Sequence, residues 1–283
     1  MAIAVIHDLT GVGRCALSVA LPVLSAMGFQ ACPAATALLS THPRFEGFVY
    51  QPVTATLESV LAHWTALEYR FEAIYVGFLT GNEVAAVRQF VKHQKQQGAT
   101  ILMDPVMGDD GKLYRFFDDT MPQYWRTLLA AADIITPNVT EACALLGHAQ
   151  QPTIQQTEIA AWIRQLQAIG PQPTVGPQPT VGPCRVVITG CYDGQTWYNY
   201  ASDVGMLPYQ ASPTGYPGTG DVFASALLGY YLQSGWKTAV QQATAVTTEL
   251  VWQTHAKGTP PREGICFEPG LLNTGKNSCL SQD

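Results

Sequence analysis

Short apolar runs alternate along this chain with longer amphipathic segments, and this alternation constrains the fold more than any other feature. Five runs are bounded by Gly, Pro, Asp or Asn and predict strands: residues 2–6, 73–76, 100–103, 134–136 and 185–189. The runs are apolar almost throughout, which is typical of strands buried on both faces. The sequence therefore predicts an α/β fold, with a mostly parallel central sheet and helices on both faces.

Eight amphipathic segments lie between and after these runs and predict helices: residues 15–27, 54–67, 82–97, 118–131, 139–146, 157–169, 221–233 and 237–254. With 283 residues and 47% hydrophobic content, the chain can bury a full core, and we expect residues 1–283 to form a single domain. Right-handed crossovers would bring the carboxyl ends of the strands to one edge of the sheet, where we expect the ligand.

A Pro-rich segment breaks the alternation. The sequence Pro-Gln-Pro-Thr-Val-Gly at residues 171–176 is repeated directly at residues 177–182. Because such a tract fits neither a helix nor a central strand, residues 170–183 predict a surface loop rather than a domain boundary or a partner-binding motif. The last residues, 271–283, show no periodicity and are expected to be frayed.

Charge and cysteine content exclude several classes of partner. The net charge is −6 and no run of Lys or Arg occurs, which argues against a nucleic-acid partner. The seven cysteines are scattered, with no zinc-ligand spacing, which indicates free thiols in a reducing compartment. The N-terminal residues lack a basic segment, and no apolar stretch is long enough to span a bilayer. We therefore expect a cytoplasmic protein that does not contact membranes.

The tetrapeptide Gly218-Thr219-Gly220-Asp221 is the first candidate for chemistry. Its glycines allow a tight turn and a close approach of the backbone to a ligand. The helix that follows would offer its first N–H groups to an anion, with Asp221 beside them as a proton acceptor. This is the arrangement that phosphoryl transfer to a hydroxyl group requires. The structural alternative is that Asp221 only caps the helix.

Two further strand ends carry carboxylates. Residues 104–112 read Asp-Pro-Val-Met-Gly-Asp-Asp-Gly-Lys and suit a loop that meets a magnesium–nucleotide complex, or a simple polar turn. Within this loop, Lys112 could neutralise phosphate charge. Asn138 and Glu141 follow the next strand and could either face a metal-bound phosphate or form a capping box at the start of a helix.

The segment His7-Asp8-Leu9-Thr10-Gly11-Val12-Gly13 is expected to leave the first strand and to enter a helix. Its polar residues could touch a substrate or form a satisfied turn. The sequence contains neither the P-loop pattern G-x-x-x-x-G-K-[ST] nor the nucleophile motif G-x-S-x-G, which excludes two large enzyme classes.

Taken together and in this order, the motifs resemble the ribokinase-like superfamily, and specifically its vitamin-B6 branch, the pyridoxal/pyridoxamine kinases. Four other segments also look like that branch: Ser40-Thr41-His42, residues 77–81 (Gly-Phe-Leu-Thr-Gly), residues 186–189 (Val-Val-Ile-Thr) and residues 262–268 (Arg-Glu-Gly-Ile-Cys-Phe-Glu). The resemblance runs from about residue 3 to residue 268. It implies a three-layer sandwich and a homodimer.

The resemblance also implies roles at the reacting centre. Asp221 would accept the proton of the substrate's hydroxymethyl group. The anion hole for the transferring phosphoryl group would be the backbone N–H groups of Gly218, Thr219 and Gly220. The magnesium ion and its waters would be organised by Asp104 and Glu141. Positioning and charge stabilisation would then do most of the catalysis.

Two more sets of residues follow from the resemblance. The nucleotide would be contacted by Asp104, Thr136, Asn138, Glu141, Thr189, Lys112, Gly218 and Gly220, with residues 108–114 as its cover. The pyridine ring would lie among Asp8, Thr10, His42 and Phe78, next to Asp221. ATP and Mg²⁺ are thus the implied cofactors, and a monovalent cation is a further one that the resemblance allows.

The chain departs from the B6 branch in two places. Pro43 stands where the branch usually carries Thr, and it offers neither a hydroxyl group nor an N–H. The stretch His-Asp-Leu-Thr-Gly comes nearer to the Gly-rich segment of hydroxymethylpyrimidine kinases than to the Ser-His pattern of pyridoxal kinases. The implied reaction is ATP-dependent phosphorylation of the 5′-hydroxymethyl group of pyridoxal, pyridoxamine or pyridoxine in B6 salvage. The alternatives are a hydroxymethylpyrimidine kinase of thiamine synthesis and a catalytically idle vitamin-binding protein.

Overall fold

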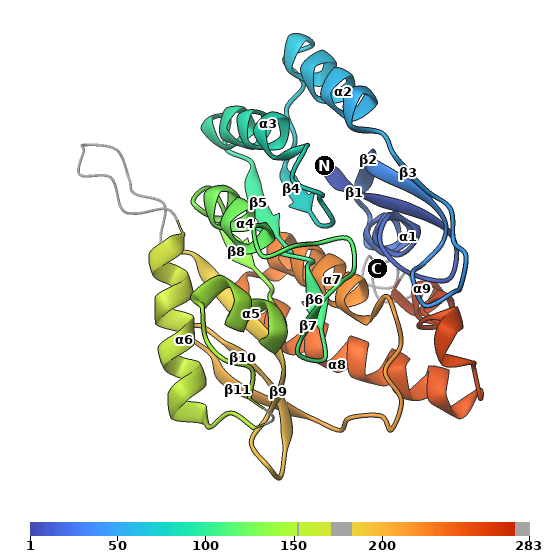
Figure 1. Cartoon of the computed structure of the whole chain (residues 1–283), viewed down its shortest axis with the longest axis vertical. Helices are drawn as coiled ribbons and strands as arrows, with labels where there is room; N and C mark the ends of the chain where they lie inside the picture. The colour runs from blue at the N-terminus through green and yellow to red at the C-terminus, as the bar shows by residue number, and fades with distance from the viewer. Residues whose placement is uncertain (152, 171–182, 275–283) are drawn as a thin grey trace, which may run out of the picture. The chain divides into compact units, whose positions relative to one another are not determined.

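The computed structural model describes residues 1–151, 153–170 and 183–274 (Figure 1). The chain forms two compact units. The first unit comprises residues 1–57 and 210–283, and the second comprises residues 58–209. The repeat at residues 171–182 and the tail at residues 275–283 lie outside the described residues. The predicted surface loop there, and the predicted single domain over the whole chain, stay predictions.

The first unit combines both ends of the chain. Strand β1 (Ala2–Val12) pairs in parallel with β2 (Gln30–Thr41), and β3 (Tyr50–Pro52) pairs antiparallel with β2. The helices are α1 (Leu17–Ala26), α7 (Thr219–Ser234), α8 (Trp236–Ala256) and α9 (Glu268–Thr274), with a 3₁₀ turn at Pro261–Glu263. Helices α7 and α8 pack against each other, and α1 packs against both β1 and α7.

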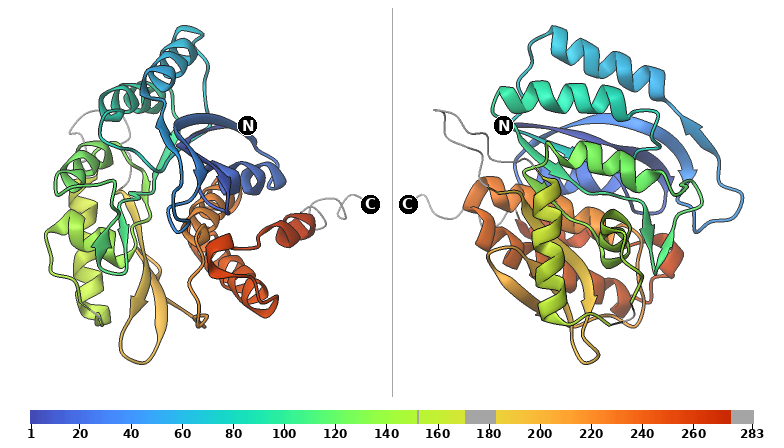
Figure 2. Two further views of the ribbon diagram at one scale, coloured as in Figure 1. Left: turned by 45° about the vertical axis from the view of Figure 1, so that its right-hand side comes forward. Right: turned by 60° about the vertical axis from the view of Figure 1, so that its left-hand side comes forward.

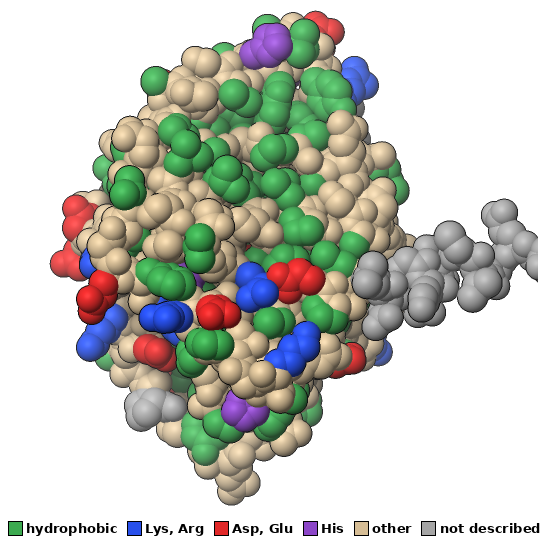
Figure 3. Space-filling view, turned by 90° about the vertical axis from the view of Figure 1, so that its right-hand side faces the viewer, with side chains coloured by type: hydrophobic (Ala, Val, Ile, Leu, Met, Phe, Trp, Pro, Cys, Tyr) green, Lys and Arg blue, Asp and Glu red, His purple; other side chains and the backbone are tan. Residues whose placement is uncertain are grey.

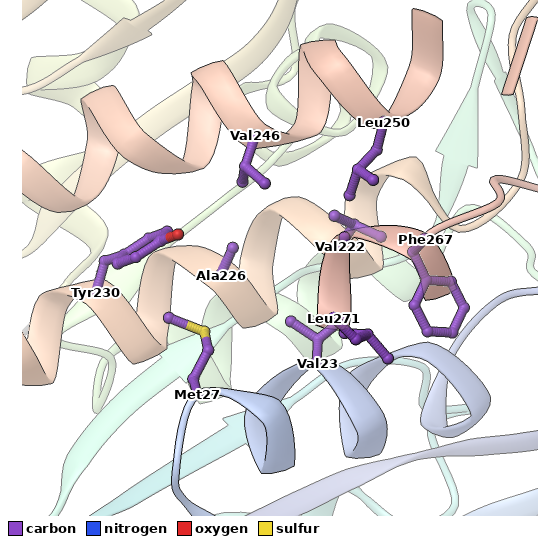
Figure 4. Close-up of a pocket in the computed structure, with 10 residues that line it drawn as sticks. Val23, Met27, Val222, Ala226, Tyr230, Val246, Leu250, Phe267 and Leu271 are labelled. Atoms are coloured by element: carbon purple, nitrogen blue, oxygen red, sulfur yellow. The ribbon is translucent and has the colours of Figure 1, made fainter. Parts of the chain in front are cut away.

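An apolar core joins the helices of the first unit. Its buried side chains are Val19, Val23, Tyr216, Val222, Leu250, Ile265 and Phe267. Figure 4 shows side chains of α1, α7, α8 and α9 pointing toward one another around a cavity of about 30 Å³. A cavity of this size holds little more than one water molecule, so the helices are closely packed and the start of α7 is held firmly.

The second unit contains six strands in the order β11-β10-β9-β8-β5-β4. Their bounds are β4 (Ala73–Val76), β5 (Thr100–Met103), β8 (Ile134–Ile135), β9 (Arg185–Tyr192), β10 (Trp197–Ala201) and β11 (Gly205–Tyr209). Strands β4, β5, β8 and β9 are parallel, and β10 and β11 extend the sheet in antiparallel fashion (Figure 2). The parallel part brings several strand ends to one edge, as the sequence predicts.

Helices surround this second sheet. They are α3 (Val84–Gln96), α4 (Met121–Leu129), α5 (Val139–Leu146) and α6 (Gln156–Ile169), while α2 (Thr54–Ala66) crosses the boundary between the units. A short hairpin, β6 (Gly108–Asp109) with β7 (Lys112–Leu113), follows β5 and lies within the predicted nucleotide loop.

The structure corrects two predictions about the ends of the chain. Strand β1 does not end at Ile6: it pairs with β2 as far as Val12, and α1 starts only at Leu17. The prediction that residues 7–13 enter a helix was therefore wrong, because these residues extend the β1–β2 ladder. Helix α9 reaches Thr274, so residues 271–274 are helical and not frayed.

Charged side chains are concentrated on part of the face shown in Figure 3, and the described cysteines are free thiols. On the face shown in Figure 3, charged side chains gather in one half of the view, while hydrophobic and other uncharged side chains fill most of the other half. The six cysteines among the described residues are all free thiols, as predicted. Within residues 1–151, 153–170 and 183–274, no helix has the length and apolar character needed to cross a bilayer.

We expect truncation of a core side chain in the first unit to lower the stability of the fold. Leu250→Ala removes a side chain that is only 5% exposed and leaves a void among closely packed helices, so the free energy of unfolding should fall by about 2–5 kcal/mol. Urea denaturation measures this free energy of unfolding. Val49→Ala, at a side chain that is 65% exposed, is the control and should change stability by less than about 0.5 kcal/mol. Equal effects of the two substitutions would contradict the assignment of the core.

Candidate functional site

The turn before α7 needs glycine at its first position. Gly218 is the N-cap of α7 with φ +83°, a conformation that side chains disfavour. A Cβ at Gly218 would also lie 2.2 Å from the carbonyl oxygen of Arg14. The hydroxyl of Thr219 donates to the carbonyl of Tyr216 at 2.7 Å, which fixes the turn. The first N–H groups of α7 have no acceptor within the helix, so this terminus is suited to an anion.

Asp221 does not cap α7. Its Oδ2 accepts a hydrogen bond from the backbone N–H of Ala16 at 2.8 Å, and its Oδ1 lies 3.1 Å from Nε2 of His7. The N-cap position of α7 is occupied by Gly218 and not by Asp221, and Asp221 is only 9% exposed. The capping alternative for Asp221 is thereby rejected. The carboxylate is buried and is held by two segments from the other end of the chain.

His7 lies between two carboxylates. Its Nδ1 is 2.9 Å from Oδ1 of Asp8, and the hydroxyl of Thr10 donates to Oδ2 of Asp8 at 2.8 Å. Burial by itself lowers the pKa of His7, but hydrogen bonds to Asp221 and Asp8 and the charges of both carboxylates outweigh burial and raise the pKa to about 10. The raised pKa favours the charged imidazolium form of His7 at neutral pH, and the backbone N–H of Asp8 also lies 3.0 Å from Nδ1. The sequence prediction named Asp8 and Thr10 and gave His7 no role.

His42, expected beside the substrate ring, fixes the loop after β2. Its Nδ1 accepts from the backbone N–H of Arg44 at 3.1 Å, and its Nε2 lies 2.6 Å from the carbonyl oxygen of Arg262. Because Nδ1 accepts, Nε2 carries the proton and donates to that carbonyl. Burial lowers the pKa of His42, and the ring is neutral. Phe45 packs edge-on against it, with 5.0 Å between ring centroids. A contact of His42 with substrate stays a prediction.

In the second unit, Asp104 and its partners lie where parallel strands end. The hydroxyl of Thr136, just after β8, donates to Oδ1 of Asp104 at 3.0 Å, and the hydroxyl of Tyr75 donates to Oδ2 at 3.4 Å. Asp104 and Thr136 are both buried. The structure therefore brings together two residues that the sequence predicted to face the nucleotide.

Glu141 forms the predicted capping box and also holds the loop after β5. Its Oε2 accepts from the backbone N–H of Asn138 at 2.9 Å, while the side chain of Asn138 accepts from the N–H of Glu141 at 2.9 Å. Its Oε1 accepts from the N–H of Met107 at 3.1 Å. The structural reading of Asn138 and Glu141 is thus confirmed, and it leaves further lone pairs on both carboxylate oxygens.

Charge in this cluster fits a cation. Burial, and then the neighbouring charge of Asp104, raise the pKa of Glu141 well above its usual range. Two buried carboxylates that repel each other are stabilised when a positive charge joins them. Across the described residues, no group of three or more His, Cys, Asp or Glu side chains is placed to hold a metal ion. What the described residues offer a cation here is thus a pair of carboxylates, Asp104 and Glu141, rather than a full set of side-chain ligands.

Three further residues of the predicted nucleotide set, Asn138, Lys112 and Thr189, belong to the same unit as this cluster. Asn138 Nδ2 donates to the carbonyl of Gly108 at 2.8 Å, which ties the β6–β7 hairpin to the start of α5. Lys112 is exposed on β7. The N–H of Thr189 donates to the carbonyl of Pro137 at 3.0 Å, so Thr189 lies beside Asn138 at the strand ends.

Phe78, predicted to contact the substrate ring, is buried after β4. Its ring packs against Phe116 and Phe117, with 5.8 and 5.4 Å between ring centroids. The cluster fixes the segment after the hairpin, and a contact of Phe78 with substrate stays a prediction.

Comparison with known proteins gives a consistent family. The family model described as phosphomethylpyrimidine kinase matches residues 19–261. A crystal structure from Bacteroides thetaiotaomicron, assigned as a candidate phosphomethylpyrimidine kinase, is 34% identical with a TM-score of 0.87 and covers 99% of this chain and 95% of its own. A second crystal form of that protein contains pyridoxal. Pyridoxal kinase from Lactobacillus plantarum is 27% identical, with a TM-score of 0.83 and 96% of each chain covered. These matches confirm the predicted ribokinase-like fold.

Curated relatives match over shorter lengths. Human pyridoxal kinase is 28% identical over 179 residues, which is 57% of this chain and 54% of that protein. Sheep pyridoxal kinase is 27% identical over 164 residues, or 54% of this chain and 50% of that protein. The chain thus spans about half the length of these curated relatives.

We expect Gly218→Ala to destabilise the protein through a clash and not only through its backbone angle. Gly147 is a matched control, because it has the same left-handed conformation (φ +73°, ψ +26°) but a Cβ there would meet nothing within 4 Å. The backbone conformation alone costs about 1–2 kcal/mol, and Gly218→Ala should lower the free energy of unfolding by more than Gly147→Ala does. Urea denaturation compares the two variants. Equal losses of unfolding free energy would contradict a clash between a Cβ at position 218 and the carbonyl oxygen of Arg14.

The raised pKa of His7 makes stability depend on pH. The unfolded imidazole has a pKa of 6.5 and the folded one about 10, so protonated His7 stabilises the fold fully below pH 6.5, and this contribution is lost as the pH rises through about 10. The difference in unfolding free energy between wild type and His7→Asn should shrink over that range in urea denaturation. His63→Asn, at an exposed histidine of α2, is the control. A difference that stays constant would contradict the prediction.

Proposed function

The chain belongs to the phosphomethylpyrimidine kinase family, and we propose that it phosphorylates the 5′-hydroxymethyl group of pyridoxal, pyridoxamine or pyridoxine. The observation that carries this proposal is Asp221, a buried carboxylate held by Ala16 and His7 on the first turn of α7. The carboxylate can accept a proton where the helix N-terminus can hold a phosphate. The solved relatives named as pyridoxal kinase, or containing pyridoxal, support a B6 vitamer as the acceptor.

The proposed reaction is a transfer of the γ-phosphoryl group of ATP. The substrate's hydroxyl oxygen forms a bond to the γ-phosphorus while its proton moves to Asp221. The bond between the γ-phosphorus and the bridging oxygen breaks, and its electron pair leaves with ADP. The backbone N–H groups of Gly218, Thr219 and Gly220 stabilise the charge on the transferring group, which positions it for attack.

Asp104 and Glu141 would hold Mg²⁺, which when bound neutralises charge on the phosphates. Thr136 orients Asp104, and the capping box of Asn138 orients Glu141. Thr189 and Lys112 are proposed to contact the phosphates of ATP. A related fold at 23% identity, pyridoxal kinase from Leishmania donovani with a TM-score of 0.76, holds ADP and pyridoxamine.

Further parts of the proposal concern substrate contacts and assembly. We propose that the pyridine ring contacts Asp8, Thr10, His42 and Phe78. A homodimer, a cytoplasmic location and a requirement for a monovalent cation also belong to the proposal. The free thiols of the described cysteines support a reducing compartment.

A hydroxymethylpyrimidine kinase is the second candidate function. It is favoured by the description of the matching family and by Pro43, which offers no hydroxyl group to a pyridine ring. Both functions use the same phosphoryl-transfer chemistry, so they differ only in the acceptor. ADP formation measured side by side with the three B6 vitamers and with hydroxymethylpyrimidine separates them. Absence of ADP with every vitamer would overturn the leading proposal.

Asp221→Asn tests both the reaction and the idle-protein alternative. Loss of a positioned general base lowers the rate about 10²–10⁴-fold, so kcat for ADP formation should fall by that factor. Asp203→Asn is the matched control, because Asp203 is exposed and its φ of +61° suits Asn as well as Asp. Turnover by Asp221→Asn within about threefold of wild type would remove Asp221 as the base.

A further inference from the structure

We propose that His7 is a positioning residue that holds Asp221 in its catalytic orientation and keeps it charged. The inference rests on the proposed function, because it takes Asp221 as the general base. Its own basis is the arrangement in the first unit, where one imidazole ring joins a strand at the N-terminus to the first turn of α7.

The placement of His7 depends on an irregularity in β1. Neighbouring residues of a regular strand point to opposite faces, yet the side chains of His7 and Asp8 meet at 2.9 Å. The register of β1 against β2 shifts between His7 and Leu9. Such a shift re-aims side chains, and it is a feature found next to active sites. Here it lets Asp8 hold one nitrogen of the ring while the other nitrogen faces Asp221.

The two ring contacts fix the imidazole in one orientation. Nδ1 faces Oδ1 of Asp8 and Nε2 faces Oδ1 of Asp221, and His7 is only 2% exposed. Thr10 in turn holds the second oxygen of Asp8. Hydrogen bonds thus join Thr10 to Asp8 and Asp8 to His7, and an ion pair of 3.1 Å joins His7 to Asp221, so that each side chain orients the next.

The backbone of Ala16 completes the hold on Asp221 from another side. Its N–H reaches Oδ2 of Asp221 at 2.8 Å. Ala16 has φ +55° and ψ −135°, an unusual conformation for a residue with a side chain. With Oδ1 facing His7 and Oδ2 facing Ala16, the carboxylate plane is set, and rotation about the Asp221 side chain would break both contacts.

The charges around His7 support a cationic ring. Titratable groups that face this cluster within the first unit include Asp8 on β1, Asp221 on α7 and Cys15 before α1. Burial, and then the charges of Asp8 and Asp221, raise the pKa of the Cys15 thiol well above its usual range, so it stays neutral. With His7 protonated, the ring and the two carboxylates carry a net charge of −1, which becomes zero when Asp221 accepts the substrate's proton.

Two substitutions at His7 separate its contacts. In His7→Gln, the side-chain amide reaches about as far as Nε2 and can still donate to Asp221, whereas in His7→Asn it reaches about as far as Nδ1 and loses Asp221. Both variants lose the positive charge. We expect His7→Asn to lower kcat about 10–100-fold, the usual loss for an orienting partner, and His7→Gln to recover much of that loss.

The pH profile and a double mutant distinguish positioning from a purely structural role. Without the cation, the acid limb of kcat should move to higher pH in both variants, while the dissociation constant for ADP, measured by calorimetry, stays unchanged. If His7 acts through Asp221, the double variant His7→Asn/Asp221→Asn should be no slower than Asp221→Asn alone.

The outcomes are distinct. A kcat for His7→Asn within about threefold of wild type, an unmoved acid limb, or multiplied losses in the double variant would each overturn the role of His7. If His7→Asn does not fold, the pH profile of His7→Gln tests the same proposal. Activity of Asp221→Asn close to wild type would instead overturn the proposed function, and with it the premise of this inference.

Discussion

The first unit depends on the burial of one carboxylate. Removing an ionised group from water costs several kcal/mol unless partners compensate it, so Asp221 requires a donor and a counter-charge. Ala16 supplies the donor through its backbone and His7 supplies the charge. These partners come from the segment before α1 and from β1, and therefore the start of α7 is tied to the N-terminal part of the chain. The apolar packing of α1, α7 and α8 keeps these segments in place.

The donor from Ala16 depends in turn on close backbone approaches near Arg14. Gly218 and Gly264 both have positive φ, and a Cβ on either would lie less than 3 Å from the carbonyl oxygen of Arg14, at 2.2 and 2.8 Å. The N–H of Arg14 faces the carbonyl of Glu263 at 3.4 Å. The segment at Arg14 is thus held between two turns from the C-terminal part of the chain. This holds Ala16 in its unusual backbone conformation and directs its N–H at Asp221.

In the second unit, the buried carboxylate of Glu141 also requires partners that compensate for its burial. Glu141 is buried and lies near Asp104, and each of its oxygens accepts a backbone N–H. The capping box and the proposed metal function are therefore not alternatives. The bonds to Met107 and Asn138 fix the carboxylate and connect the loop after β5 with the start of α5. A residue that caps a helix can also present its remaining lone pairs to the waters of a cation.

Sequence patterns predicted the parts of this structure that depend on local order. Residues 73–76 and 100–103 were predicted with the bounds of β4 and β5, because strands buried on both faces are continuous apolar runs. Strand β2 was missed: it contains Pro33, and its residues alternate between buried and exposed without a clear hydrophobic period. The antiparallel strands β10 and β11 were missed as well, since β10 contains Asn199 and β11 contains Gly205 and Pro208, residue types that are depleted in strands.

His7 shows why part of the site could not be found in this way. Its partner Asp221 comes from a helix near the other end of the chain, and the contact depends on a shift in strand register that no spacing of residue types encodes. The available signal was a neighbouring acid and base, His7 and Asp8, that directly follow five apolar residues of a strand. Charged side chains are rarely buried without partners, so a charged pair at the end of a buried strand implies a third group that is distant in sequence. That argument predicts a partner for His7, and only the fold identifies it as Asp221.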